Sequence, residues 1–157
     1  MRAPLFVPIA LLLACSGDDA DATDSGASGP AADVTCTAVV DGEPWEADPT
    51  RAFWNSHHAD ALSISCSLAD SSSGILINIA GYTGPGTYAL TEGQTYGQYL
   101  GGALSTEPGA WVSTTGSVEV TGDDGSVVRG TFAFDGTDTN LQTTKVVESG
   151  SFVLERE

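Results

Sequence analysis

The stretch LSISCSL, residues 62–68, alternates apolar and polar side chains along its whole length. A period of two places Leu62, Ile64 and Cys66 on one face of an extended chain and the serines on the other. Strands with one buried and one wet face are typical of antiparallel sheets. The fold prediction therefore starts from half-buried strands.

The same alternation recurs on both sides of this stretch. It is found in residues 34–40, 75–79, 118–120, 132–134 and 152–154. Clusters of Gly, Asp and Pro at residues 41–42, 70–74, 84–86, 123–125 and 135–136 supply turns between these runs. This spacing predicts an all-β fold, an antiparallel sandwich or small barrel of roughly eight to ten short strands.

The N-terminus has a different composition. Arg2 is followed by an apolar run that ends in Leu-Leu-Ala-Cys at residues 12–15. A small residue before a cysteine is what a lipoprotein signal peptidase needs, and the run is shorter than the roughly 20 residues that span a bilayer. We expect residues 1–14 to be a signal peptide and Cys15 to carry lipid in a bacterial cell envelope, with the outer membrane favoured and the domain in the periplasm or at the cell surface.

Residues 15–33 are expected to form the lipidated cysteine and a disordered acidic tether, because they are rich in Ser, Gly, Ala and Asp. Without Arg2 the chain keeps 4 basic and 21 acidic residues, a formal charge of −17. Phosphate binding needs a basic surface, so nucleic acid is excluded as a partner. The membrane contact is expected to run through the lipid on Cys15 alone.

Residues 34–157 are long enough for one domain with a core. Cys36 and Cys66 are left as a pair once Cys15 carries lipid, and export would place them in an oxidising compartment. We therefore predict a Cys36–Cys66 disulfide.

One hairpin can be predicted to the level of residue pairs. A three-residue loop at 123–125 with a left-handed Gly125 would place Val120 opposite Val128 inside the sheet. The same register places Glu119 opposite Arg129 on the outer face.

Several short motifs resemble a family of small bacterial lipoproteins that have no assigned activity. They are GEPWEA at residues 42–47, GTYAL at 86–90, and three Gly-led strands at 116–120, 130–134 and 150–154. The resemblance implies a compact β-domain with a lipocalin-like appearance and no known chemistry. Trp45 in the first motif is expected to fill the core.

Candidate sites for metals and catalysis are weak. His57 and His58 are adjacent, so on a strand they would point to opposite faces, with Asp60 nearby. Asp135, Asp138 and Asn140 lack the ligand spacing of a calcium loop. The sequence has no nucleophile elbow, and Asp is common in turns for local hydrogen bonding. We expect no metal, no cofactor and no enzymatic activity.

Residues 82–111 hold all four tyrosines and Trp111. Tyr88 and Trp111 are expected to face the core, whereas residues 92–109 are predicted to be a mobile, exposed loop. Aromatic and amide side chains suit contact surfaces, so the candidate binding residues are Tyr96, Tyr99, Gln94 and Gln98. The function predicted is binding of an unknown protein, glycan or small ligand; the alternative is a lipocalin-like barrel that encloses a small apolar ligand.

Overall fold

Ten antiparallel strands form one sheet in the computed structural model, which describes residues 33–56, 60–91, 93–102 and 105–157. The strands are β1 (Thr35–Val40), β2 (Glu43–Glu46), β3 (Ala52–Asn55), β4 (Ala61–Ser67), β5 (Ser73–Ala80), β6 (Gly86–Ala89), β7 (Tyr96–Gly101), β8 (Gly109–Asp123), β9 (Val127–Asp138) and β10 (Thr143–Glu155). A 3-10 turn, η1 (Pro49–Arg51), precedes β3. Within these ranges, no helix has the length and apolar character that crossing a bilayer requires.

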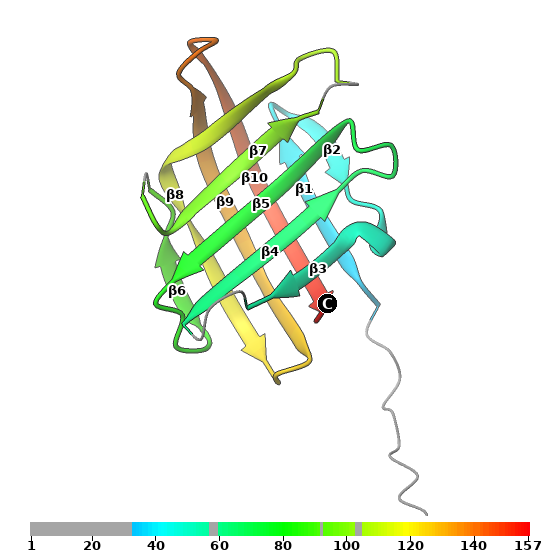
Figure 1. Ribbon diagram of the computed structural model, residues 1–157, viewed down its shortest axis with the longest axis vertical. Helices are drawn as coiled ribbons and strands as arrows, with labels where there is room; N and C mark the ends of the chain where they lie inside the picture. The colour runs from blue at the N-terminus through cyan, green and yellow to red at the C-terminus, as the bar shows by residue number, and fades with distance from the viewer. Residues whose placement is uncertain (1–32, 57–59, 92, 103–104) are drawn as a thin grey trace, which may run out of the picture. The chain divides into compact units, whose positions relative to one another are not determined.

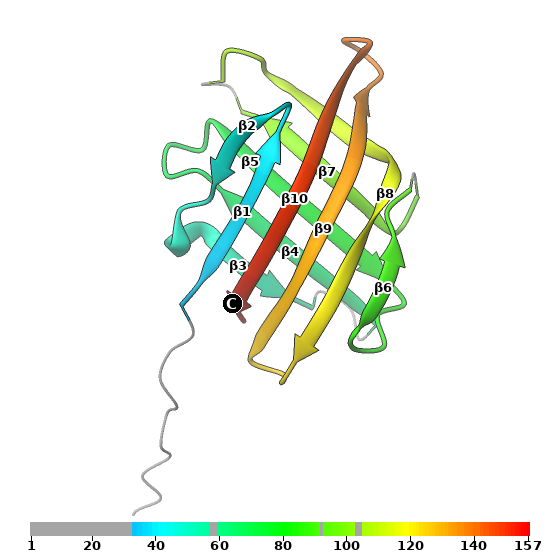
Figure 2. The same cartoon turned by 180° about the vertical axis from the view of Figure 1, so that it is seen from behind.

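The sheet curls into a half-barrel with two facing layers. The strand order is β2-β1-β10-β9-β8-β7-β5-β4-β3, and β6 pairs with β8 off this path. One layer contains β3, β4, β5 and β7 (Figure 1), and the other contains β1, β10, β9 and β6 (Figure 2). A single parallel bridge between Trp54 and Arg156 connects β3 with the residue that follows β10. The predicted all-β antiparallel class is confirmed, in the form of a curled half-barrel.

Strand β8 joins the two layers because it bends in the middle. Its first residues pair with β7 and its last residues pair with β6. The register with β9 shifts between Ser113 and Thr115, and Gly116 follows with a φ of +145°. A Cβ at Gly116 would lie 2.4 Å from the carbonyl oxygen of Ala133, so only glycine allows the strand to turn this close to β9.

The apolar face of each strand points between the layers. Leu62, Ile64, Ile77 and Val118 are fully buried there, as the alternation predicts. Trp45 also belongs to this core and donates a hydrogen bond from Nε1 to Ser73 Oγ at 2.8 Å. The expected core role of Trp45 is confirmed.

A disulfide between Cys36 and Cys66 links the two layers, as predicted. Cys36 lies on β1 and Cys66 on β4, their Cα atoms are 6.3 Å apart, and both side chains are buried. Their inward positions follow from the same period of two that buries Leu62 and Ile64.

The predicted register of the β8–β9 hairpin is wrong, although its inward faces are correct. Val120 lies opposite Gly130 rather than Val128, and Glu119 lies opposite Thr131 rather than Arg129. Next to the turn, Gly122 pairs with Arg129, three positions beyond the predicted register, and the extra β8 residue at the bulge between Val120 and Gly122 reverses one of these positions. The net shift of two positions preserves the faces. Gly125 does have a positive φ, of 86°.

The predicted loop over residues 92–109 is also wrong. Its central part forms β7, which lies between β5 and β8 in the sheet. Asn78 pairs with Tyr96, and Ile75 pairs with Tyr99. Residues 96–101 are therefore part of the sheet.

Candidate functional site

A cavity of about 530 Å³ opens at one end of the half-barrel, and we call it the mouth pocket. Its walls come from the β1–β2 turn, the residues just before β8, the start of β8, and the β9–β10 connection, which lie together at the top of Figure 1. The lining residues are Asp41, Glu107, Pro108, Trp111, Leu141, Thr143, Thr144 and Lys145. Strand β1 begins at the opposite end of the domain, with Thr35 (Figure 2).

The floor of the mouth pocket is the indole of Trp111. Its Nε1 donates a hydrogen bond to Thr143 Oγ1 at 3.0 Å. The ring of Tyr99 packs against it with centroids 5.8 Å apart. Gly136 lies against the backbone of Trp111, where an added Cβ would come 2.8 Å from the Trp111 carbonyl oxygen. The hydrogen bond to Thr143 and the contact with Tyr99 hold the ring, and only 2% of Trp111 is exposed.

Lys145 crosses the pocket above this ring. Its Nζ lies 2.8 Å from Asp41 Oδ2, 2.5 Å from Glu107 Oε2, and 5.4 Å from the centroid of Trp111. The hydrogen bonds with Asp41 and then Glu107 are the main reasons that the pKa of Lys145 is raised. The ammonium group of Lys145 thus connects β10 with the β1–β2 turn and with the residues just before β8.

The carboxylate of Asp41 is held ionised in this arrangement. Partial burial opposes its ionisation, but the hydrogen bonds from Lys145 and from the Val146 N–H outweigh burial and lower its pKa. Asp41 also has a φ of +51° in the turn, a conformation that Asp tolerates better than most residues. Its side chain therefore ties the β1–β2 turn to β10.

Asp138 fixes the hairpin behind the pocket. Oδ2 accepts the Ala110 N–H at 2.8 Å, and Oδ1 accepts the N–H groups of Asn140 and Leu141 at 2.8 and 3.0 Å. The backbone hydrogen bond from Ala110 is the largest of the causes that lower the Asp138 pKa. Both oxygens serve the backbone, and among the described residues no group of three or more potential metal ligands is found.

Apolar side chains are unusually exposed near this end. Leu141, in the pocket wall, is 49% exposed, and Val146 and Leu100 are 43% and 37% exposed. Leu141 and Leu100 approach the same short segment, because Leu141 Cδ1 lies beside Gly109 and Leu100 pairs with Ala110. Of these three residues, only Leu141 lines the mouth pocket, and an apolar side chain exposed in the wall of a cavity is typical of binding sites.

The structure separates the binding residues that the sequence suggested. Tyr99 reaches the floor of the mouth pocket through Trp111. Tyr96 and Gln94 instead line another cavity, beside Asn78 and Ala80, where the Gln94 carbonyl accepts a hydrogen bond from Asn78 Nδ2 at 2.6 Å. Gln98 is half-buried on β7.

Some predicted sites cannot be placed. Cys15 with its tether, and His57 with His58, lie outside the described residues. The mouth residues Asp41, Glu107 and Lys145 were missed by the sequence analysis. One signal was available, since Lys145 is the only lysine in the chain.

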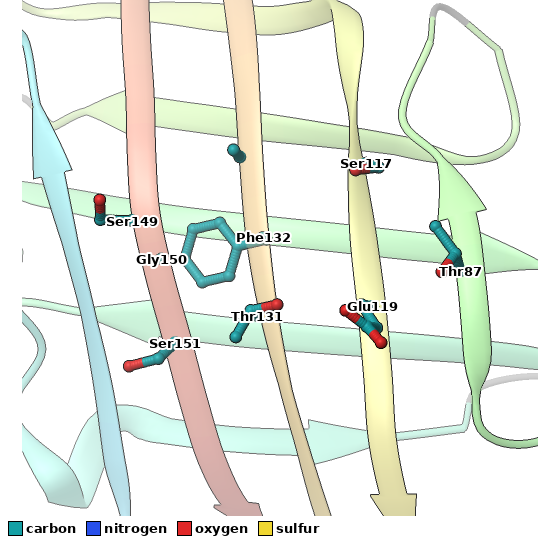
Figure 3. Close-up of a pocket in the computed structure, with 9 residues that line it drawn as sticks. Thr87, Ser117, Glu119, Thr131, Phe132, Ser149, Gly150 and Ser151 are labelled. Carbon is teal, nitrogen blue, oxygen red and sulfur yellow. The ribbon is translucent and has the colours of Figure 1, made fainter.

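A second depression lies on the outer face of β6, β8, β9 and β10 (Figure 3). Thr87, Glu119, Thr131 and Ser151 form a row of side chains across these four strands, because each is the register partner of the next. The Phe132 ring lies beside Gly150, at the base of the depression. Most side chains around this depression are those of Ser and Thr, whereas the mouth pocket combines apolar walls with charge, so the mouth is the stronger candidate site.

The fold and site define a small antiparallel half-barrel with a filled interior and a cavity at its open end. The chain belongs to a family described as a domain of unknown function, DUF6252, whose model matches residues 33–154. No curated protein and no solved structure matches the chain.

Proposed function

We propose that this protein is an exported bacterial lipoprotein, anchored by lipid on Cys15. The proposal is supported by the Leu-Leu-Ala-Cys sequence at residues 12–15 and by the acidic, low-complexity segment that follows it. The buried Cys36–Cys66 disulfide is a second support, because such bonds persist in oxidising compartments outside the cytosol.

Metabolic labelling with radioactive palmitate tests the anchor. The wild-type chain should incorporate label and sediment with membranes, and Cys15→Ser should lose both properties. Cys36→Ser is the matched control, since it changes a cysteine that is expected to carry no lipid. Label that persists in Cys15→Ser would refute the proposal.

We further propose that the domain is a non-enzymatic binding module whose ligand occupies the mouth pocket. One observation carries this proposal, namely that Leu141, Pro108 and Trp111 form apolar walls around the convergent polar groups of Lys145 and its partners. Small-ligand sites have this composition and occur in the mouths of β-barrels. The hydrogen bonds with Asp41 and Glu107 raise the pKa of Lys145 and so favour its charged form. A charged ammonium group suits ligand contact better than nucleophilic chemistry.

The alternative, a lipocalin-like barrel with an apolar ligand inside, is less well supported. The space between the layers is occupied by large buried side chains, among them Phe132, Phe134 and Phe152. A barrel of this size can be filled by its own residues. A ligand would then reach the mouth and stop at Trp111.

Binding of Nile red, a neutral apolar dye, tests the site. We expect its fluorescence to rise with the full chain carrying Cys15→Ser, and to rise several-fold less when Leu141→Glu is added. Val146→Glu is the matched control, because Val146 is about as exposed but lies on the outer face of β10. Equal responses of the two variants would show that the mouth pocket is not the binding site.

A further inference from the structure

We infer that the ligand of the mouth pocket carries a positively charged amine attached to an apolar body. This inference rests on the proposed function, and it adds the chemical class of the ligand. It follows from the net negative charge of the pocket, from the exposed carboxylate of Glu107, and from the exposed apolar wall.

The charge of the pocket is negative even with Lys145 in place. Asp41 and Glu107 are two carboxylates against one ammonium group. Residues 34–157 contain sixteen acidic and four basic residues, so the wider domain adds to the same sign. Like charges raise the cost of bringing an anion into such a site, and a cation is attracted to it.

The other basic side chains of the domain are engaged elsewhere. Arg129 lies 3.6 Å from Asp124 at the β8–β9 turn, Arg51 donates to Ser71, and the guanidinium of Arg156 stacks over Trp54. Within the described residues, Lys145 is therefore the one cation that an anionic ligand could use at the mouth. Such a ligand would have to displace a carboxylate from Lys145, whereas an amine needs no displacement.

Glu107 is suited to receive an added amine. It uses Oε2 for Lys145, and no partner is found for Oε1 in the described part of the chain. Its side chain is 62% exposed, so it can turn toward a ligand at little cost. A second ammonium group could share Glu107 with Lys145 in the way that Lys145 already shares two carboxylates.

Lys145 covers the indole of Trp111, which is only 2% exposed, so this ring is not open to a second ammonium group. Leu141 and Pro108 offer an apolar surface that the chain itself leaves open. An amine with an apolar body would place its ammonium group at Glu107 and its body against this apolar wall.

A head-group series tests the inference. Heptylamine, heptanol and heptanoate have the same apolar chain and differ in charge at neutral pH, so calorimetric titration of the full chain carrying Cys15→Ser isolates the head group. We expect heptylamine to bind at least about tenfold more tightly than heptanoate, with a preference that shrinks at high salt. Glu107→Gln should remove most of this preference, while Glu43→Gln, which changes an exposed carboxylate of β2, should leave it unchanged.

The source of the amine is distinguished by a second pair of probes. Acetyl-Leu-Lys-Leu-amide and acetyl-Leu-Glu-Leu-amide present the same chemistry on a peptide. Tighter binding of the lysine peptide than of heptylamine would assign the amine to a protein partner, and the reverse order would assign it to a small molecule.

Three results would overturn the inference in different ways. Equal binding of all three heptyl probes would leave an apolar mouth pocket without charge selectivity. Preferred binding of heptanoate would make Lys145 an anion site. Binding of none of them, together with no response of Nile red to Leu141→Glu, would remove the mouth pocket as a ligand site and the proposed binding function with it.

Discussion

The packed interior and the mouth of this half-barrel are built from the same strands but with opposite chemistry. Toward the end of β10 the inward residues are Phe152 and Leu154, which are fully buried, whereas near its start the inward residue is Lys145, paired with two carboxylates. The interior gains its stability from apolar contacts. The mouth instead leaves charged and apolar groups accessible, which is the arrangement that the proposed binding function requires.

The interior should respond most strongly to a cavity. Phe152→Ala removes a ring that stacks on Phe132 with centroids 6.3 Å apart, and we expect it to lower the free energy of unfolding by about 3–5 kcal/mol. Urea denaturation followed by circular dichroism measures this. Val153→Ala, on the half-exposed outer face, should cost far less; similar losses would show that the interior is not the tightly packed region described here.

Loss of the disulfide should have the next largest effect. Replacing Cys36 and Cys66 with Ala frees a loop with a sequence separation of 30 and should lower the free energy of unfolding by about 3–4 kcal/mol. The same urea transition in wild-type protein treated with reductant is the control, and it should move in the same direction. An unchanged midpoint in both would contradict a stabilising role for the bond.

Substitutions of two tyrosines on β7 should distinguish a side chain packed on the interior from one at the surface beside it. Tyr99 packs on the core and on Trp111, so Tyr99→Ser should cost about 1–3 kcal/mol of unfolding free energy. Tyr96→Ser should cost less, because Tyr96 is not among the residues packed against the core. Thermal unfolding of the two variants in parallel makes the comparison, and a larger loss for Tyr96→Ser would reverse these assignments.

The charged mouth should contribute least to stability. Lys145→Met removes an ammonium group whose partners are partly exposed, and we expect a loss of about 0.5–1 kcal/mol at pH 7. Because the folded-state pKa of Lys145 is raised, its contribution is complete below the unfolded pKa of roughly 10.4 and is lost as the pH rises through the folded value. The difference between wild type and variant should therefore vanish in strongly alkaline buffer; a difference that persists there would have another origin.

Sequence alternation was enough to predict the strands whose inward residues are apolar. The alternation around Ile64 and Ile77 predicted β4 and β5, and it placed Cys66 of the predicted disulfide on the inward face. The method failed at β7 for a physical reason. Its inward positions include Gly97 and Gly101, where a Cβ would lie 2.8 Å from the Phe134 ring and 2.0 Å from the Glu107 carbonyl oxygen, respectively. A strand whose inward space is filled by its neighbours carries no apolar signal of its own.

The mouth pocket was beyond the reach of local patterns. Asp41, Glu107 and Lys145 are separated by more than thirty residues at each step, and only the strand order brings them together. The hairpin register failed for a related reason, since the bulge after Val120 depends on pairing geometry and leaves no mark in the alternation. The alternation of apolar and polar residues predicts which faces of the strands are buried. It does not predict which turns and strand ends lie side by side.

The disulfide also determines how the domain would carry a mechanical load. Tension applied along the chain from its N-terminal side enters the described domain ahead of Thr35 and reaches Cys36, the second residue of β1, almost at once. There the covalent bond to Cys66 passes the force to β4 in the other layer, so that β1 cannot be peeled from β10 one hydrogen bond at a time. In the oxidised protein both layers must be strained together, whereas reduction would leave β1 as a single strand that can be unzipped.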